Sequence, residues 1–261
     1  MMMDMATFNS KMDSDGFAIF PNLLDTAFTQ QLNRDCLKWV KICEAYQIAA
    51  GINEAGDGTG HHSLGAHDSI DDYIDQHLLH DYIAEYFKQQ PYILHACNPI
   101  AGAPKKRNYV HNIHRDTRTY IPEYHFRLNM IVMLDDFTSE NGATQVLLGS
   151  HRQSTAPDEA LFNAQYVELL GKAGTVVLFN SYLWHRGGLN ITDQNRVALT
   201  LSFGPAYIKP QLDYARMLGE DYGLGLSALT RHVLGYNARV PCSLDEWYQK
   251  ADARLYHANQ G

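Results

Sequence analysis

The middle of the chain consists of short segments in which apolar residues alternate with polar ones or form brief unbroken runs, separated by turn residues. This rhythm predicts strands rather than helices. The expected strands cover residues 92–98, 127–134, 144–148, 166–170, 175–179 and 196–203, and a shorter one covers 16–20. Many short strands in succession indicate a sandwich or barrel. We therefore expect a double-stranded β-helix (jelly roll, cupin-like) with its core at approximately residues 91–205.

Helical spacing of apolar residues marks the two flanks instead. The expected helices cover residues 25–45 and 70–87 before the strands and 211–218, 226–234 and 244–251 after them. Residues 51–65, rich in glycine and polar side chains, predict a mobile loop. The C-terminal helices are too short to form an independent domain. We expect a single domain over residues 1–261, mainly β with α additions, in which the flanking helices pack against the outside of the barrel.

Composition narrows the class of protein. Apolar residues make up 45% of the chain and charged residues 19%, and no apolar run approaches the ~20 residues needed to span a bilayer. The first residues lack the basic start and apolar stretch of a signal peptide, which predicts a cytoplasmic location. Basic and acidic residues number 21 and 29, a formal charge of −8. That charge argues against nucleic acid or an anionic membrane as a partner.

Candidate chemistry is concentrated in His114, Asp116 and His185. Side chains at i and i+2 of an extended strand project from the same face, so His114 and Asp116 can point at one metal ion. His185 follows the expected strand at 175–179 and could face the pair from the opposite sheet. Two imidazoles and one carboxylate form the facial triad that holds non-haem Fe(II) and leaves positions open for O₂ and a co-substrate.

Arg196 opens a strand whose other residues are uncharged. Its guanidinium would therefore be poorly solvated and needs an anionic partner, which a dicarboxylic co-substrate could provide in a bidentate contact. This pattern favours 2-oxoglutarate. Asn98 and Asn129 stand on expected strands beside the ligand segment and could hydrogen-bond the co-substrate from within the barrel. An ordinary core amide is the alternative for both.

The order of these motifs resembles a known family. The segment Asp15–Leu24, then His114–Asp116, then Glu140–His151, then Trp184 with His185, and finally Arg196 together resemble the phytanoyl-CoA dioxygenase family of Fe(II)/2-oxoglutarate-dependent oxygenases. The resemblance covers roughly residues 13 to 205. One departure is Gly187, where family members often carry a hydroxyl residue.

By this resemblance, His114, Asp116 and His185 are the iron ligands, and Arg196 holds the distal carboxylate of 2-oxoglutarate. The resemblance further implies a dioxygenase that consumes O₂, hydroxylates an unactivated C–H bond of a small metabolite and releases succinate and CO₂. Related halogenases replace the carboxylate ligand by a small residue, so Asp116 favours hydroxylation or another oxidative outcome such as desaturation.

A local excess of positive charge bears on the substrate. Residues 105–127 contain two acidic residues and six basic ones, which are Lys105, Lys106, Arg107, Arg115, Arg118 and Arg127. If the mouth of the site is electropositive, it could attract an anionic small molecule. Solvated loop charges are the plainer interpretation.

Two other functions remain open at this stage. One is a cupin-like enzyme that holds another divalent metal and does not use 2-oxoglutarate, because affinity alone does not select the metal. The other is a non-catalytic protein that binds a metal or a ligand. The first leaves Arg196 without a purpose, and the second would be signalled by a lost ligand, whereas all three are present. The oligomeric state is not predicted.

Overall fold

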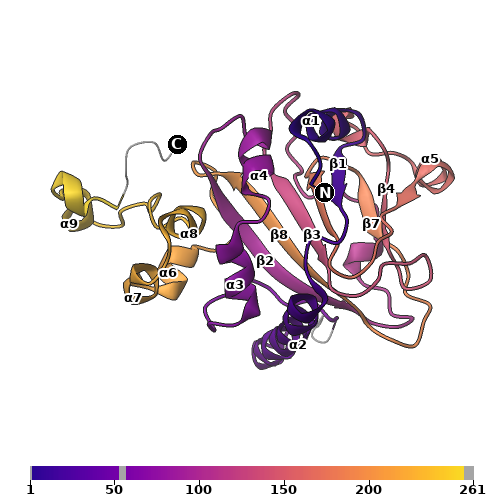
Figure 1. Ribbon diagram of the computed structural model, residues 1–261, viewed down its shortest axis with the longest axis horizontal. Coiled ribbons are helices and arrows are strands. Elements are labelled where there is room, and N and C mark those ends of the chain that lie inside the picture. Colours follow the sequence, from indigo (N-terminus) through magenta and orange to yellow (C-terminus); the bar gives the residue numbers. More distant parts are fainter. Residues whose placement is uncertain (1, 53–56, 256–261) are drawn as a thin grey trace.

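The strands form two antiparallel sheets in the computed structural model, which describes residues 2–52 and 57–255 (Figure 1). The larger sheet has the order β1-β6-β3-β8-β2, and the smaller has the order β5-β4-β7. The strands are β1 (Phe17–Phe20), β2 (Tyr92–Gly102), β3 (Leu128–Met133), β4 (Thr144–Val146), β5 (Val167–Glu168), β6 (Val176–Asn180), β7 (His185–Gly187) and β8 (Arg196–Pro205). Because β1 pairs with β6, the sheet extends beyond the expected core at 91–205.

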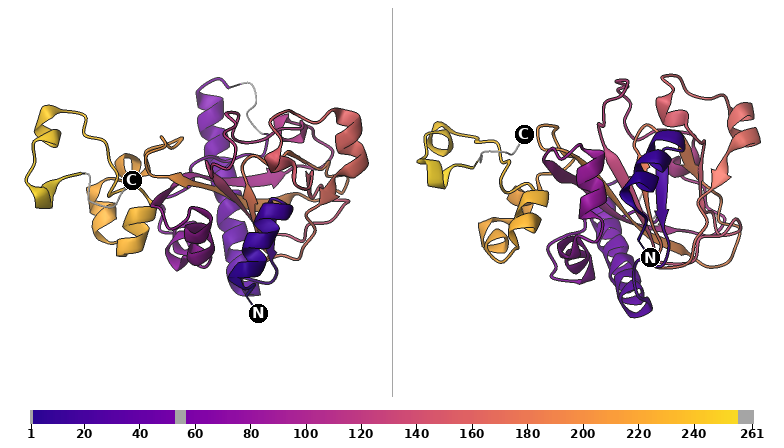
Figure 2. Two further views of the ribbon diagram at one scale, coloured as in Figure 1. Left: turned by 90° about the horizontal axis from the view of Figure 1, so that it is seen from above. Right: turned by 45° about the horizontal axis from the view of Figure 1, so that its top comes forward.

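Most helices gather outside the larger sheet (Figures 1 and 2). The α-helices are α1 (Met5–Ser14), α2 (Thr26–Ala49), α3 (Ser69–Gln76), α4 (His80–Tyr86), α5 (Glu159–Gln165), α6 (Tyr214–Leu218), α7 (Glu220–Leu224), α8 (Ala228–Val233) and α9 (Leu244–Trp247). Short 3₁₀ turns are η1 (Tyr109–His111), η2 (Ser150–Arg152) and η3 (Ala251–Ala253). Buried residues of α1 to α4 join those of β2, β3, β6 and β8 in one apolar cluster. These helices therefore cover the outer face of the sheet.

Strand β3 separates two apolar clusters by simple alternation. Leu128, Met130 and Val132 belong to the cluster beneath the helices, whereas Ile131 and Met133 belong to the cluster between the two sheets. Successive strand residues point to opposite faces, so a strand buried on both sides reads as an unbroken apolar run. Asn129 interrupts that run on the face toward the smaller sheet and is therefore available to the space between the sheets.

The single helix expected over residues 70–87 is wrong, because the chain breaks it into α3 and α4. His77 adopts a left-handed conformation with φ of 50°, which ends the hydrogen-bond ladder of α3. Its Nε2 lies 2.9 Å from Thr230 Oγ1 at the start of α8. A tertiary contact thus accompanies a break that apolar periodicity does not reveal.

Helices α1 and α5 escaped the sequence analysis, and so did the five-residue helix α7. Helix α1 begins after Asp4 and α5 after Asp158, and each carboxylate accepts a hydrogen bond from a backbone N–H of the first turn. Such capping is typical of helix starts. Both helices are short, and their apolar residues are too few to dominate a periodic pattern.

The expected loop at 51–65 has more order than predicted where the structure describes it. Residues 53–56 lie outside the described residues. Thr59 forms a bridge with Ile100 of β2, and the Ser63 N–H donates to the Cys97 carbonyl at 2.9 Å. This segment therefore runs along β2 and is fastened to it.

The C-terminal helices differ in how they meet the barrel. Buried residues of α6 and α8 join the apolar cluster beneath the larger sheet, as expected. Helix α9 lies apart from the sheets (Figure 1), with Leu244 and Trp247 exposed at 73% and 63%, so the expected packing against the barrel is wrong for this segment. No helix in the described ranges combines the length and apolar character needed to cross a membrane. The single domain and the cytoplasmic location stay predictions.

Candidate metal centre and co-substrate pocket

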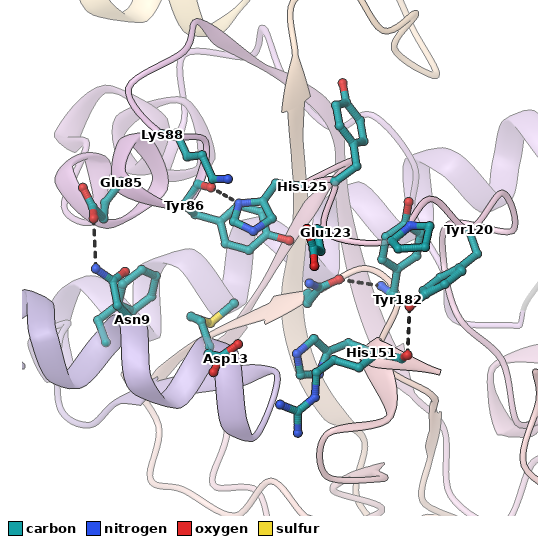
Figure 3. Close-up of a pocket in the computed structure, with 16 residues that line it drawn as sticks. Asn9, Asp13, Glu85, Tyr86, Lys88, Tyr120, Glu123, His125, His151 and Tyr182 are labelled. Carbon is teal, nitrogen blue, oxygen red and sulfur yellow. Dashed lines mark hydrogen bonds between the residues drawn. The ribbon is translucent and has the colours of Figure 1, made fainter. Parts of the chain in front are cut away.

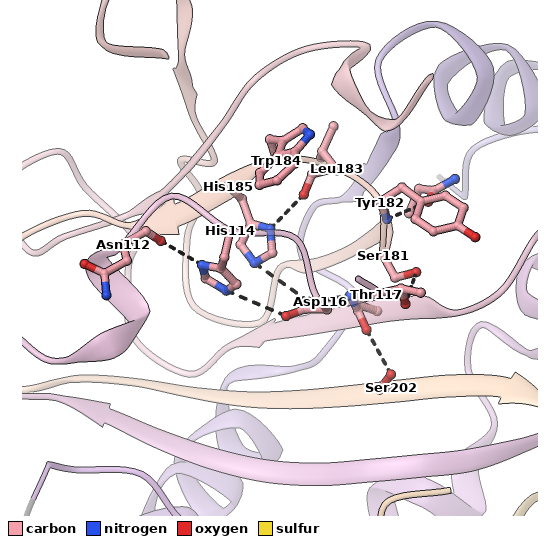
Figure 4. A network of polar contacts seen from close by, with 12 residues as sticks. Asn112, His114, Asp116, Thr117, Ser181, Tyr182, Leu183, Trp184, His185 and Ser202 are labelled. Atoms are coloured by element: carbon pink, nitrogen blue, oxygen red, sulfur yellow. Dashed lines mark hydrogen bonds and ion pairs between the residues drawn. The ribbon is translucent and has the colours of Figure 1, made fainter. Parts of the chain in front are cut away.

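Three side chains converge between the two sheets (Figure 4). One donor atom each from His114, Asp116 and His185 lies within 4.8 Å of the others. His114 Nε2 is 3.6 Å from Asp116 Oδ1, and His185 Nε2 is 3.8 Å from Asp116 Oδ2. The His185 side chain is 9% exposed, whereas those of His114 and Asp116 are 35% and 33% exposed. The cluster is therefore supported on one side and open on the other.

Backbone pairing brings the cluster together. The N–H of His114 donates to the carbonyl of His185, and the reverse hydrogen bond is also present, each at 2.9 Å. The Asp116 N–H donates to the Ser181 carbonyl at 3.1 Å. The predicted delivery of His185 from a distant segment is thus what the fold shows. The regular strand expected for His114 and Asp116 is reduced to an isolated bridge at His114, with Asp116 in the bend that follows.

Each imidazole is oriented by a backbone carbonyl. Nδ1 of His114 lies 2.8 Å from the Asn112 carbonyl oxygen, and Nδ1 of His185 lies 2.9 Å from that of Leu183. A carbonyl only accepts, so each Nδ1 carries a proton, and in the neutral form of each ring Nε2 holds the lone pair. Burial lowers the pKa of His185, as does His114, whereas the Asp116 carboxylate raises it, and the net direction is downward. A lowered pKa favours the neutral imidazole that a metal requires.

Asp116 is held by an amide whose own orientation is set. Nδ2 of Asn129 donates to Asp116 Oδ2 at 2.6 Å, and the hydroxyl of Ser202 donates to Asn129 Oδ1 at 2.9 Å. The carboxylate identifies which end of the amide is the NH₂ group, because an ionised carboxylate only accepts, and the serine hydroxyl then donates to the amide oxygen. Asn129 therefore contacts the carboxylate of the triad, and its predicted contact with a co-substrate stays a prediction.

A cavity of about 220 Å³ opens beside the cluster. All six residues singled out from the sequence border it, and these are Asn98, His114, Asp116, Asn129, His185 and Arg196. Asn98 Oδ1 also accepts the N–H of His62 at 3.0 Å, which ties the segment after residue 57 to β2. The co-substrate contact predicted for Asn98 stays a prediction as well.

Arg196 borders this cavity and forms no ion pair within 4.0 Å with any described residue. Its Nε is enclosed and has no hydrogen-bond partner among the described residues. Its guanidinium carbon lies 4.2 Å from the centroid of the Phe137 ring. Burial lowers the pKa of Arg196 to about 10, against the opposing charge of Asp135. Asp135 already accepts the Val197 N–H at 2.7 Å. The guanidinium is therefore suited to a carboxylate that enters from the cavity.

The structure adds Thr144 to the residues considered from the sequence. Thr144 of β4 pairs with Gly187 of β7, and both border the cavity. Thr144 thus places a hydroxyl across from the position where Gly187 lacks one. Thr144 lies within the Glu140–His151 motif that the sequence analysis identified. The sequence does not show that it pairs with Gly187.

A larger cavity of about 630 Å³ lies elsewhere (Figure 3). It is bordered by α1, α4 and residues 120–125, and it shares no lining residue with the cavity at the triad. Its contacts include Asn9 Nδ2 to Glu85 Oε1 at 2.9 Å and the Tyr120 hydroxyl to the Arg152 carbonyl at 2.8 Å. Size therefore does not select the candidate site, whereas the donor chemistry does.

Two histidines and a carboxylate around one point, between antiparallel sheets and beside an enclosed arginine, define the class of non-haem iron oxygenases. The model of the phytanoyl-CoA dioxygenase (PhyH) family matches residues 12–198. The chain belongs to this family, as its motifs predicted. Membership confirms the predicted family, which is one of non-haem Fe(II)/2-oxoglutarate-dependent dioxygenases whose cofactors are Fe(II), 2-oxoglutarate and O₂.

Individual relatives agree with this assignment. The chain is 36% identical to the uncharacterized protein Rv1501 of Mycobacterium tuberculosis over 148 residues, 57% of this chain and 54% of that protein. It is 31% identical to dioxygenase trt7 of Aspergillus terreus over 147 residues, 51% of this chain and 49% of that protein. The chain thus spans about half the length of these curated relatives.

A solved structure supports the fold. EctD from S. alaskensis, crystallised with 2-oxoglutarate and 5-hydroxyectoine, superposes with a TM-score of 0.58 at 21% identity. The match covers 77% of this chain and 76% of that chain. Together with the two antiparallel sheets, this similarity confirms the predicted jelly-roll class with added helices.

Proposed function

We propose that this protein is an Fe(II)- and 2-oxoglutarate-dependent hydroxylase that acts on an unactivated C–H bond of a small, negatively charged metabolite. The observation that supports it most directly is that the triad and an enclosed arginine without a full counter-charge border one cavity. A cupin-like metal enzyme without 2-oxoglutarate gives that arginine no role. A purely binding protein has no need of two imidazoles held with their lone pairs toward a carboxylate.

The residues fit the implied cofactors. His114, Asp116 and His185 would hold the iron, because each imidazole donates through Nδ1 and so presents Nε2 to a metal, and the carboxylate is fixed by Asn129. Arg196 would hold the distal carboxylate of 2-oxoglutarate. When bound, the iron, 2-oxoglutarate and O₂ supply an oxidant able to remove hydrogen from an unactivated carbon, with release of succinate and CO₂.

Part of the cavity wall is apolar. Ile100, Ile131 and Phe179 face it with apolar groups. Apolar walls reduce the water around a reacting centre and so limit side reactions. They also accept the hydrocarbon part of a substrate. Desaturation uses the same site, and the position of the substrate would choose between the two outcomes.

The first test is spectroscopic. Anaerobic addition of Fe(II) and 2-oxoglutarate should give a weak visible charge-transfer band when the keto acid chelates the iron. The band should require His185 and should need far more 2-oxoglutarate in Arg196→Ala. Absence of the band in the wild-type protein, or its persistence in His185→Ala, would contradict the proposal. Metabolite pools can then be screened for stimulation of succinate formation.

A further inference from the structure

A second arginine borders the same cavity from the end opposite Arg196. Arg127 immediately precedes β3, and the pairing of Leu128 with Phe203 places it beside Gly204 of β8. Arg196 begins β8, so eight residues of one strand separate the two positions, roughly 26 Å between backbones at ~3.3 Å per residue. Asn129, which holds the triad carboxylate, pairs with Ser202 between them. The two arginines thus approach the metal centre from different ends.

The guanidinium of Arg127 is largely removed from water. Its Nε is buried and has no hydrogen-bond partner in the described part of the chain. Burial lowers its pKa, and Asp116 is the acidic group that opposes this shift. The charge of Asp116 would be shared with a metal ion once one is bound. A desolvated guanidinium without a hydrogen-bonded counter-charge is costly, which favours a role that is fulfilled by a ligand.

The group behind Arg127 supplies no negative charge. His95 is fully buried, and burial together with the charge of Arg127 lowers its pKa to about 4. The imidazole is therefore neutral at pH 7. It lies against Gly204, where an added Cβ would be 2.4 Å from His95 Cε1. Arg127 consequently keeps its charge available toward the cavity.

Three of the other basic residues of the 105–127 segment are paired, packed or exposed outside this cavity, and Lys106 borders a neighbouring pocket. Lys105 pairs with Asp193 at 2.8 Å. Arg115 lies 5.2 Å from the ring centroid of Trp184 and donates to the Gln153 carbonyl. Arg118 is exposed. Of the six basic residues, Arg127 alone borders the cavity.

We infer that Arg127 binds an anionic group of the substrate, a carboxylate or a phosphate, and so positions the carbon to be hydroxylated at the triad. The inference rests on the proposed function, because the Arg196 end of the cavity is then occupied by 2-oxoglutarate. Arg127 is a specificity-determining residue in this arrangement. Its planar fork suits either anion.

The test measures binding without turnover. Protein loaded with Ni(II) and 2-oxoglutarate is titrated by calorimetry with benzoate, cyclohexanecarboxylate and phenyl phosphate, each beside its neutral counterpart, benzamide, cyclohexanecarboxamide and phenol. Arg127→Gln is compared with Arg118→Gln, which removes the same charge from an exposed position of the same segment. Affinity for 2-oxoglutarate is measured first in each protein. If the wild-type protein does not bind 2-oxoglutarate, the proposed function is refuted, and this outcome is distinct from a failure of the inference about Arg127.

We expect at least one acid to bind the wild type more tightly than its neutral counterpart, and Arg127→Gln to weaken that acid about 10–100-fold. Arg118→Gln should change the affinity for that acid by no more than about twofold. Arg127→Gln should bind 2-oxoglutarate with wild-type affinity. The acid that responds distinguishes carboxylate from phosphate. The inference is overturned if no acid is preferred, if both variants respond alike, or if Arg127→Gln loses affinity for 2-oxoglutarate as expected for Arg196→Ala.

A second variant separates binding from folding. Arg127→Met keeps the length of the side chain and removes an unpartnered charge, so the Ni(II)-loaded variant should melt at or above the wild-type temperature while losing the preference for the acid. A marked fall in melting temperature in both Arg127→Met and Arg127→Gln would assign Arg127 a structural role and overturn the inference.

Discussion

Removing the amide of Asn129 should weaken iron binding more than it weakens folding. Its Nδ2 donates to Asp116 Oδ2 at 2.6 Å, and the bond is charge-assisted because the acceptor is a carboxylate. Such a bond contributes about 1.5–3 kcal/mol. In Asn129→Ala the carboxylate can rotate away from the two imidazoles. Metal binding must then reorient the Asp116 carboxylate, and this lowers the affinity for Fe(II).

The expected loss follows from these magnitudes. A change of about 1.5–3 kcal/mol corresponds to roughly 10–150-fold in the Fe(II) dissociation constant, in line with the 10–100-fold typical of partners that orient metal ligands. Ser202→Ala removes a bond between neutral groups, of about 0.5–1.5 kcal/mol, and acts only through the amide. Its effect should be several-fold smaller.

The assay is anaerobic competition for Fe(II) with a chromophoric chelator, followed by titration of 2-oxoglutarate into the iron-loaded protein. Melting of the metal-free variants serves as the folding control. If Asn129→Ala kept its Fe(II) affinity within twofold but lost affinity for 2-oxoglutarate, the amide would contact the co-substrate, as the sequence alone suggested. The positioning role would then be wrong.

Three further outcomes test other parts of the site. Arg196→Ala should weaken 2-oxoglutarate about 10–100-fold with little change in Fe(II) affinity, and Lys should rescue it only partly because it lacks the planar fork; an unchanged 2-oxoglutarate affinity would rule out the assigned contact. Asp116→Ala should stay folded but lose most iron and most succinate formation, and Asp116→Glu should also be poor because the longer side chain misplaces the oxygen; near wild-type turnover with normal iron content would remove Asp116 from the triad. His95 has a pKa of about 4 in the folded state against an ordinary value of 6.5, so its contribution to stability is complete above pH 6.5 and is lost as pH falls toward 4, up to about 3 kcal/mol. Denaturant titrations from pH 7 to 4 should show a flatter dependence in His95→Gln than in the wild type, and parallel curves would contradict this account.

The strand-rich middle could be predicted because its signal is local. The apolar runs at residues 127–134 and 196–203 mark strands buried on both faces, whichever strands they pair with. The ends of helices are less visible. Neither the break at His77, which contacts Thr230 across the fold, nor the separation of α9 from the barrel leaves a mark in apolar periodicity.

The candidate site shows the same division. The sequence by itself determined the donor types, since His114, Asp116, His185 and Arg196 carry their chemistry in their side chains and in their order along the chain. Only the tertiary structure decided what each polar neighbour contacts. Asn129 donates to Asp116 while it accepts from Ser202 of β8, and Arg127 alone of its basic segment borders the cavity. Hydrogen bonds and burial depend on atoms brought together from distant segments, and neither chain order nor spacing specifies these partners.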